Sequence, residues 1–344
     1  MSNILIIGAG AMGTAFAYPC LDNDHNVSIV GTHLENNLID KLNTDRFHTG
    51  LNLKISEKIK FFKHETISNF FSKQIDLIVI GVNSKGINWI ADKLNENTSN
   101  IKKLPPLLML TKGLSVYNNK YELLVDKLIR LLSEKNIKDI NLSAVGGPCL
   151  AAGLANRVQS GVVIANKNLE LANKLKDMLN TNYYRISTTK DVNGVEVCAA
   201  IKNIFSIAIG AAPGLNNNKL KNNLHLNTSA ALMRQSIYEM GIFVEFLNGN
   251  KETVNGLAGL GDLYVSAAGG RNSRMGYLIG DGISYSEVKK SKMQNVTVEG
   301  AELVFEIGKK VKEDFDDKRL PLMSAIINAI INDRKLKIKW ENFN

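Results

Sequence analysis

The stretch that decides the fold opens the chain, where Asn3-Ile4-Leu5-Ile6-Ile7 runs directly into Gly8-Ala9-Gly10-Ala11-Met12-Gly13. The first five residues are almost continuously apolar, which is typical of a strand buried on both faces of a parallel sheet. Residues 14–21 continue in small and apolar side chains suited to a packed helix. The pattern G-x-G-x-x-G therefore stands in the strand–turn–helix context of a dinucleotide-binding fold, and a second apolar run at 26–30 follows it.

Each glycine of this turn has its own expected role. Gly8 would allow the tight turn, Gly10 the close approach of a pyrophosphate, and Gly13 the close packing of helix on strand. The pyrophosphate charge would rest on N–H groups at the helix start and on the positive end of the helix dipole. The predicted cofactor-binding turn comprises Gly8, Gly10, Ala11, Met12 and Gly13.

The end of the second predicted strand bears on the choice between NADH and NADPH. A site for NAD usually places Asp or Glu about 20 residues beyond the glycines, on the ribose 2′-hydroxyl. His33 stands at that distance from Gly13, and Thr32 precedes it. The sequence therefore favours NADPH, with Thr32 and His33 at the cofactor, because no carboxylate there would repel a 2′-phosphate. Glu35 lies close enough to keep NADH open, and His33 could equally be an ordinary exposed loop histidine.

Strands and helices are expected to alternate along the first half of the chain. Residues 119–134 and 169–179 have helical spacing, and further strands are predicted at 76–82, 107–110, 142–145, 161–165 and 183–187. This alternation predicts a doubly wound, Rossmann-type α/β domain over residues 1–189. Over residues 190–344 the spacing is helical almost throughout, which predicts an all-α domain with an exposed asparagine- and lysine-rich loop at 216–223.

Composition limits the class of protein. The 344 residues are 44% hydrophobic and carry a net charge of +9, so the chain can fill a core and is mildly basic. We expect no nucleic-acid partner, because no basic patch is interleaved with aromatic residues. Three cysteines without C-x-x-C and five histidines without H-E-x-x-H predict neither a disulfide framework nor a metal site. With no signal-peptide pattern and no run of about 18 apolar residues, we expect a cytoplasmic protein without membrane insertion.

The second half contains the residues best suited to chemistry. A predicted helix over 192–212 is rich in alanine and isoleucine, yet it includes Lys202 and Asn203. Because burying an unpaired ammonium is unfavourable, a lysine in such a helix either extends to the surface or is held for catalysis. The glycine-rich segment 256–263 contains Asp262, an acid that could orient this ammonium. Nine residues further on, Arg271-Asn272 offers a guanidinium and an amide suited to phosphate.

Seven short motifs, taken in order, give the chain a resemblance to the NAD(P)-dependent glycerol-3-phosphate dehydrogenases. Their number, order and rough spacing carry the resemblance, since any one of them alone is weak. The motifs are the N-terminal GAGAMGTAFA, Lys112-Gly113-Leu114, Gly146-Gly147-Pro148, Ala200-Ile201-Lys202-Asn203, the GLAGLGDL segment, Arg271-Asn272 and Val298-Glu299-Gly300.

The resemblance implies a reaction and a set of site residues. The family reduces dihydroxyacetone phosphate reversibly to sn-glycerol 3-phosphate with NADH or NADPH and feeds glycerophospholipid synthesis. By this resemblance Lys202 is the catalytic lysine that supplies or takes the proton at the carbonyl oxygen, and Asp262 is the acid beside it. Implied substrate contacts are Lys112, Gly147, Cys149, Asn203, Arg271 and Asn272, and implied cofactor contacts include Lys112, Ala151, Arg271 and Glu299. A homodimer is implied in the same way.

Several positions depart from the family pattern. Cys149 follows Gly-Pro where a small polar residue is usual, Gly270 replaces a serine before Arg271, and Ala11-Met12 replaces a frequent Ser-Trp or Ser-Phe. Cys149 is expected to be a small core residue rather than a nucleophile.

Because Cys149 and Gly270 would lie beside the substrate, the first alternative is a dehydrogenase of the same fold that acts on another phosphorylated ketose or polyol. A reductase like ketopantoate reductase is a second alternative, and a non-catalytic NAD(P)H-binding sensor a third. The presence of Lys202 together with Asp262 disfavours the sensor, which would need the glycine turn but no proton donor.

Overall fold

The computed structural model describes residues 1–98, 104–216 and 225–343. The chain divides into two compact units, Met1–Lys112 with Leu124–Val192, and Gly113–Leu123 with Asn193–Asn344. The break at Val192 lies close to the boundary of 189 expected from the sequence. The segment Gly113–Leu123 belongs with the second unit, which the sequence analysis did not anticipate.

The first unit is built on one eight-stranded sheet in the order β12-β11-β10-β7-β6-β1-β2-β5. All neighbouring strands pair in parallel except β10 and β11, which are antiparallel. The strands predicted from the sequence are confirmed to within a few residues at their ends. Their bounds are β1 Asn3–Ile7, β2 Asn26–Val30, β6 Leu77–Ile80, β7 Leu107–Met109, β10 Leu142–Gly146, β11 Ser160–Ala165 and β12 Tyr184–Thr189. The edge strand β5, Lys60–Phe62, is one that the sequence pattern did not predict.

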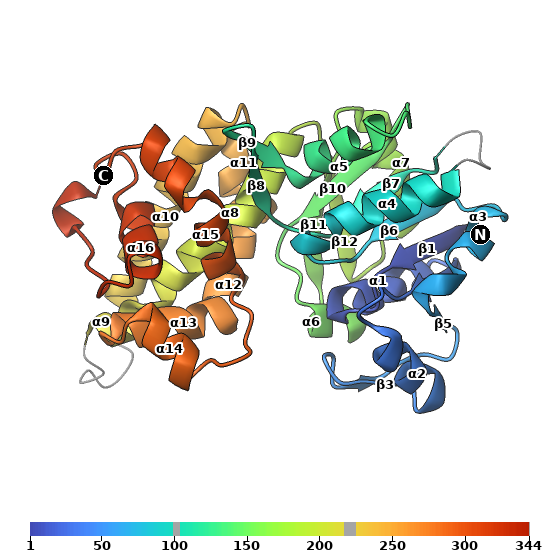
Figure 1. The fold of residues 1–344 in the computed structure, drawn as a ribbon, viewed down its shortest axis with the longest axis horizontal. Helices are drawn as coiled ribbons and strands as arrows, with labels where there is room; N and C mark the ends of the chain where they lie inside the picture. The colour runs from blue at the N-terminus through green and yellow to red at the C-terminus, as the bar shows by residue number, and fades with distance from the viewer. Residues whose placement is uncertain (99–103, 217–224, 344) are drawn as a thin grey trace. The chain divides into compact units, whose positions relative to one another are not determined.

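Helices cover both faces of this sheet, so the alternating side chains of each strand are buried on both sides. Ile4 and Ile6 of β1 belong to the core cluster formed with α1, α6 and α7. Leu5 and Ile7, which alternate with them along the strand, are not part of that cluster but are just as buried. The second face lies against α4 and α5, which pack on one another, and Figure 1 shows α4 and α1 on opposite sides of the strands. The helices are α1 Ala11–Asp22, α4 Ile87–Thr98, α5 Leu124–Ser133, α6 Ala151–Ala155 and α7 Leu169–Leu179.

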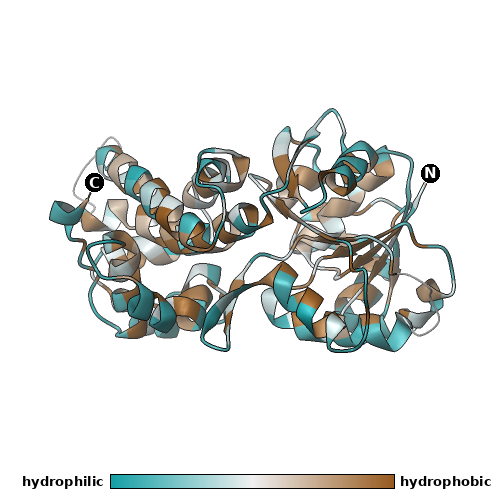
Figure 2. Cartoon of the chain, turned by 90° about the horizontal axis from the view of Figure 1, so that it is seen from above, coloured by the Kyte–Doolittle hydropathy of each residue, from teal (hydrophilic) through white to brown (hydrophobic). Residues whose placement is uncertain are grey.

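Short elements complete the first unit. They are the helices α2 Asn36–Thr44 and α3 Ser68–Phe71, the 3₁₀ turns η1 His64–Thr66 and η2 Ser84–Gly86, and the two-stranded pair β3 Phe47–His48 and β4 Leu53–Lys54. In Figure 2 the sheet strands are the most hydrophobic segments of this unit, and polar residues lie on the outer faces of its helices.

In the described residues of the second unit, the regular structure is helical apart from one hairpin. Its long apolar helix α8 lies at the centre, since residues from Val195 to Ile209 are almost all buried. The stretch Val192–Leu215 is long and apolar enough to cross a membrane, yet 94% of its most apolar window is buried inside the protein, as in a core helix. The helices are α8 Val192–Gly210, α9 Ala212–Leu215, α10 Leu226–Phe246, α11 Glu252–Asn255, α12 Asp262–Ala267, α13 Arg271–Gly280, α14 Tyr285–Ser291, α15 Glu299–Asp314 and α16 Pro321–Ile331, with a π-helical turn η3 Leu257–Gly261 and a 3₁₀ turn η4 Trp340–Asn342.

The hairpin corrects the predicted helix over 119–134. Strands β8 Leu114–Tyr117 and β9 Lys120–Leu123 pair in antiparallel fashion, and α5 begins only at Leu124. The Tyr121 ring of β9 packs edge-on against Phe243 of α10 at a centroid distance of 5.3 Å, which explains why this segment belongs to the second unit. Residues 217–223 of the expected asparagine-rich loop lie outside the described residues.

Candidate active site

The glycine turn has the geometry of a dinucleotide-binding turn. Gly8 follows β1 with a φ of +114°, and a Cβ there would lie 2.7 Å from the carbonyl carbon of Gly81. A Cβ on Gly13 would lie 2.2 Å from the carbonyl oxygen of Gly8, so both positions require glycine. Gly10 caps α1, and a Cβ added there would meet only Glu35 Oε1, at 3.7 Å. The space above Gly10 and the start of α1, where no side chain caps the helix, therefore fit a pyrophosphate.

Glu35 is the residue of this region that the sequence analysis left undecided. Its Oε2 accepts hydrogen bonds from the backbone N–H of Ala9 at 3.1 Å and of Thr32 at 2.7 Å. The carboxylate thereby links the glycine turn to the turn after β2. His33 is exposed, and its ring lies 5.6 Å from that of Trp89 and 6.4 Å from that of His64.

The remaining predicted residues of the first unit lie after the carboxyl ends of β7 and β10. Lys112 follows β7 and is half-buried, and Gly147 follows β10 with a φ of +128°. A Cβ on Gly147 would lie 3.0 Å from the carbonyl oxygen of Gly161, so this position also requires glycine. Cys149 and Ala151 are partly buried and pack against the core cluster on the α1 face, which agrees with a packing role for the thiol.

In the second unit a buried ion pair joins α8 to α12. Lys202 is 6% exposed and Asp262 is 2% exposed, and the Lys202 ammonium donates to Asp262 Oδ1. It also donates to Ser266 Oγ at 2.8 Å. These contacts span 60 and 64 residues of sequence. Because removing two charges from water is unfavourable unless they are paired and hydrogen-bonded, these contacts explain how both charged groups can be buried.

A second network continues directly from the residue after Lys202. Asn203 Oδ1 accepts a hydrogen bond from Asn272 Nδ2 at 3.0 Å, and Asn272 Oδ1 accepts one from the Gly300 N–H at 2.9 Å. Arg271, next to Asn272, forms an ion pair with Glu299, next to Gly300. The structure thus joins Asn203, Asn272 and the Gly300 N–H in one chain of hydrogen bonds. The Arg271–Glu299 ion pair joins the first residues of the same two helices, α13 and α15.

Glycines allow the helices of this network to approach α8 closely. A Cβ on Gly300 at the start of α15 would lie 2.3 Å from the Asn203 carbonyl oxygen. A Cβ on Gly276 of α13 would lie 2.0 Å from the Ile207 carbonyl oxygen. In the GLAGLGDL segment, Gly259 is the tightest position, since its Cβ would lie 2.1 Å from the Val254 carbonyl oxygen. That segment forms the π-helical turn η3, which leads into Asp262 as the first residue of α12.

Sequence reasoning missed Ser266. It lies four residues after Asp262 on α12, and this spacing places both side chains on one face of the helix. The spacing alone could have suggested that Ser266 joins Asp262 at the lysine. The role of the Gly300 N–H could not be recognised in the same way, because it depends on how α13 meets α15.

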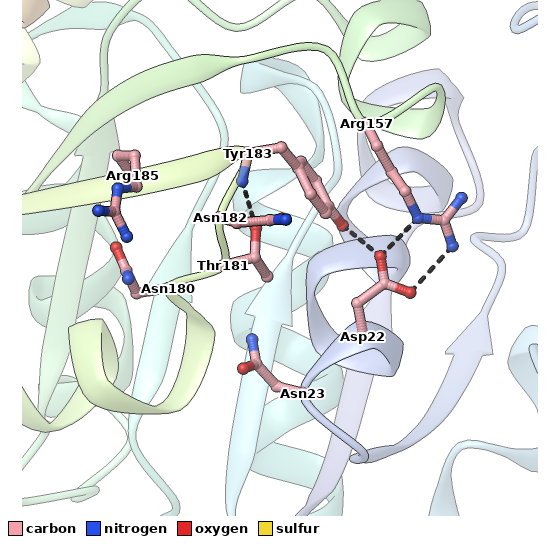
Figure 3. A pocket seen from close by; sticks show the side chains of 8 residues that line it. All are labelled: Asp22, Asn23, Arg157, Asn180, Thr181, Asn182, Tyr183 and Arg185. Carbon is pink, nitrogen blue, oxygen red and sulfur yellow. Dashed lines mark hydrogen bonds and ion pairs between the residues drawn. The ribbon is translucent and has the colours of Figure 1, made fainter.

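A polar cavity of about 610 Å³ in the first unit contains none of the predicted site residues. Figure 3 shows that it is arranged around Asp22, which accepts hydrogen bonds from Arg157 Nε at 2.7 Å and from the Tyr183 hydroxyl at 2.7 Å. The Arg157 guanidinium holds the pKa of the Asp22 carboxyl below its usual range. These contacts join the end of α1 to the start of β12, and they account for the cluster as a stabilising link within the unit.

The fold and both groups of residues are those of a dinucleotide-dependent oxidoreductase with a buried lysine–aspartate pair in its helical unit. The family comparison narrows this class: residues 3–172 match the N-terminal profile and residues 191–340 the C-terminal profile of NAD-dependent glycerol-3-phosphate dehydrogenase. The chain therefore belongs to the NAD-dependent glycerol-3-phosphate dehydrogenase family.

Curated relatives agree with this assignment, and a solved structure shares the fold. An NADP(+)-dependent glycerol-3-phosphate dehydrogenase of Archaeoglobus fulgidus is 29% identical over 90% of this chain and 91% of its own length. A glycerol-3-phosphate dehydrogenase (NAD(P)+) of Bacillus cereus is 27% identical over 98% of this chain and 94% of its own length. The crystal structure of a glycerol-3-phosphate dehydrogenase from Coxiella burnetii has a TM-score of 0.79 and 24% identity, and covers 97% of this chain and 96% of that one.

Proposed function

We propose that the chain catalyses the reversible, NAD(P)H-dependent reduction of dihydroxyacetone phosphate to sn-glycerol 3-phosphate, a product consumed in glycerophospholipid synthesis. Family membership over nearly the whole chain supports this activity. The observation that carries it within the structure is the buried Lys202, paired with Asp262 and hydrogen-bonded to Ser266.

Lys202 is proposed as the proton donor in the reducing direction and the acceptor in reverse. Negative charge develops on the ketone oxygen during reduction, and a nearby ammonium stabilises that charge and then supplies the proton. Asp262 and Ser266 would hold the ammonium in one orientation, because each accepts one of its N–H bonds. Asp262 would also keep the site close to neutral before the substrate enters.

Arg271 is proposed to bind the phosphate of the substrate. The side-chain amides of Asn203 and Asn272 are proposed to bind its other oxygens. The Arg271 side chain is 55% exposed and its partner Glu299 is 41% exposed, so the guanidinium is accessible to a dianion. A phosphate that binds Arg271 would compete with or displace Glu299, since both offer oxygen acceptors to the same group. Asn203 and Gly300 fix the Asn272 side chain, so its second amide N–H would point in a defined direction and could donate to the substrate.

The first unit is proposed to hold the cofactor through Gly10, Ala11 and Met12 at the start of α1. When bound, the reduced nicotinamide supplies the hydride. Further proposed contacts from the family resemblance are Gly8, Gly13, Thr32, His33, Lys112, Ala151, Arg271 and Glu299 for the cofactor, and Lys112, Gly147, Cys149 and Asn203 for the substrate.

The alternatives are less well supported. A pure cofactor sensor does not need a lysine buried against an acid. A dehydrogenase for another phosphorylated ketose was motivated by Cys149 and Gly270, but Cys149 packs against the core and Gly270 has a backbone conformation that favours glycine. A cytoplasmic homodimer is the state we propose from the family resemblance, and light scattering of the purified chain would test the dimer.

The proposed activity is tested by following oxidation of NADH and NADPH with dihydroxyacetone phosphate. Lys202→Ala should lower kcat by about 100-fold or more, in line with the contribution of general acid catalysis, while cofactor affinity stays within a few-fold. Lys202→Arg keeps a cation beside Asp262 but supplies no readily transferable proton, and it should also be strongly impaired.

Lys251→Ala is the matched control, because this lysine of the same unit is exposed and pairs with Glu245 at the surface. It should retain wild-type kinetics. Full activity in Lys202→Ala, or loss of cofactor binding with unchanged turnover per bound cofactor, would contradict the role given to Lys202.

A further inference from the structure

We propose that His48 is a positioning residue for the cofactor: by binding the carbonyl oxygen of Ala9, it directs the Gly10 N–H toward the pyrophosphate. This inference rests on the cofactor part of the proposed function, and it adds to that site a residue of the short strand β3. No sequence motif indicated His48, because 39 residues separate it from Ala9 along the chain.

The His48 side chain is buried, and both of its ring nitrogens have backbone partners. Nε2 lies 3.0 Å from the carbonyl oxygen of Ala9, within the glycine turn. Nδ1 accepts from the Leu51 N–H at 3.2 Å, and the His48 carbonyl oxygen shares this N–H at 3.1 Å. Because a carbonyl oxygen can only accept, the ring hydrogen is on Nε2. His48 therefore donates a hydrogen bond to Ala9.

The Ala9 carbonyl oxygen is held by two side chains, and this fixes the direction of the next N–H. Besides His48, Thr14 Oγ1 of α1 donates to it at 3.0 Å, and both Ala9 and Thr14 are fully buried. In a planar trans peptide, the C=O of one residue and the N–H of the next point in opposite directions. The Gly10 N–H therefore points away from His48 and Thr14. Within the described residues 1–98, 104–216 and 225–343, this N–H donates to no protein acceptor.

The orientation of the Gly10 N–H matches the need of the proposed pyrophosphate site. Gly10 has open space beside it, since an added Cβ would meet only one side-chain atom, at 3.7 Å. Backbone N–H groups at the start of a helix bind phosphate oxygens, and hydrogen bonds to charged oxygens are among the stronger ones. A donor whose direction is already fixed loses little freedom on binding. His48 would thus raise cofactor affinity without contacting the cofactor.

The segment that carries His48 is itself packed against the start of α1. His48 pairs with Leu53 of β4 in the antiparallel pair, and Leu51 between the two strands belongs to the core cluster on the α1 face. A Cβ on Gly50 would lie 3.7 Å from the Cβ of Ala11, the first residue of α1, and 3.2 Å from the His48 ring. The ring is therefore held in place from its own segment, which is what a positioning role requires.

The test measures binding by isothermal titration calorimetry, with NADH and NADPH titrated separately into the full chain without substrate. In His48→Gln the side-chain amide reaches the position of Nε2 and can still donate to Ala9, whereas the shorter amide of His48→Asn reaches only the position of Nδ1. His48→Leu has no donor. We expect His48→Gln to bind within about threefold of wild type, and the other two variants about 10-fold or more weakly. The loss should be equal for NADH and NADPH, because the two share the pyrophosphate.

His25→Leu is the matched control, because His25 makes the same pair of contacts beyond the far end of α1. Its Nδ1 accepts from the Ser2 N–H at 3.2 Å, and its Nε2 lies 2.9 Å from the Met178 carbonyl oxygen. This variant should lower the unfolding temperature but leave cofactor affinity within about twofold. In steady-state kinetics, the effect of His48→Leu should appear in the KM for the cofactor, with kcat at saturating cofactor reduced less than about twofold.

Wild-type affinity in His48→Leu, a loss in His48→Gln as large as in His48→Leu, or the same loss in His25→Leu would overturn the proposal. If His48→Leu does not fold, the two amide variants decide the question, and equal affinities of His48→Gln and His48→Asn would overturn it. Failure of wild type to bind either cofactor would overturn the cofactor premise as well. Cofactor affinities that change as expected, without turnover of dihydroxyacetone phosphate, would instead count against the proposed reaction and leave the role of His48 standing.

Discussion

At the scale of single residues, Gly270 shows how a departure from a family pattern can have a backbone cause. Gly270 precedes α13 with a φ of +92° and a ψ of −170°, a region that is essentially confined to glycine. No atom lies within 4 Å of a Cβ built there, so space does not require glycine. In the sequence, the departure at Gly270 raises the alternative of a different phosphorylated substrate. Its dihedral angles give another reason for the glycine, which is that this residue sets the start of α13, where Arg271 and Asn272 lie.

Gly270→Ser should therefore destabilise the second unit by about 1–3 kcal/mol or shift the start of α13. Because Arg271 is the first residue of that helix, we also expect a higher KM for dihydroxyacetone phosphate. Thermal unfolding and steady-state kinetics measure both effects. Gly269→Ser is the matched control, since Gly269 also has open space around it but no positive φ. Equal behaviour of the two serine variants would remove the backbone role of Gly270.

At the scale of secondary-structure elements, the hairpin β8–β9 is the element that local sequence patterns failed to predict. The helix at 169–179 and the strands of the sheet other than β5 have strong apolar patterns, and the sequence predicts them almost to their ends. Residues 119–123 directly precede the amphipathic helix α5. The predicted helix therefore began five residues too early, at 119 instead of Leu124. The signal that was overlooked is the pair Asn118-Asn119 between two alternating segments, with φ values of 48° and 58° in a two-residue turn.

This turn predicts opposite effects of two substitutions at Asn119. A type I′ turn needs positive φ at both central residues, so Asn119→Gly should be neutral or slightly stabilising. Asn119→Val should destabilise the hairpin by about 1–2 kcal/mol, because a branched side chain is strained at that φ. Urea unfolding followed by fluorescence, with Tyr121 packed on Phe243 in the hairpin interface, measures the difference. A valine variant as stable as the glycine variant would show that the turn conformation is not required.

At the scale of the whole molecule, the candidate site could be predicted as a set of residues but not as an arrangement. Motif order identified Lys202, Asp262, Arg271 and Asn272, but their partners Ser266 and Gly300 depend on how α12 and α15 pack against α8. Likewise, the sequence indicated Glu35 as a residue near the cofactor, but it did not predict the hydrogen bond that its carboxylate accepts from the Ala9 N–H. Local periodicity determines which segments become helices or strands, whereas contacts across 28 to 84 residues depend on how the helices pack against one another.

One such long-range contact makes the stability of the molecule depend on pH. Glu239 of α10 is fully buried, and its carboxylate accepts from the N–H groups of Leu322 at 2.7 Å and Met323 at 2.8 Å, at the start of α16. Gln235 Nε2 donates to it at 2.9 Å. Burial raises the pKa of Glu239 to about 7, while these hydrogen bonds act in the opposite direction. The folded protein thus keeps the proton up to a higher pH than the unfolded chain does.

Between about pH 4.5 and 7 the folded state binds more protons at Glu239 than the unfolded state, so the contribution of this group to stability falls as pH rises through that range. A shift of this size corresponds to roughly 3 kcal/mol, and to a change of about 5–10 °C in unfolding temperature. Glu239→Gln removes the titration, so the unfolding temperature of wild type minus that of the variant should decrease from pH 5 to pH 8. Glu245→Gln, an exposed carboxylate on the same helix, serves as the control and should show no such trend. If the difference between wild type and Glu239→Gln stays constant across this range, Glu239 is already ionised in the folded protein at pH 5 and the hydrogen bonds from α16 outweigh the effect of burial.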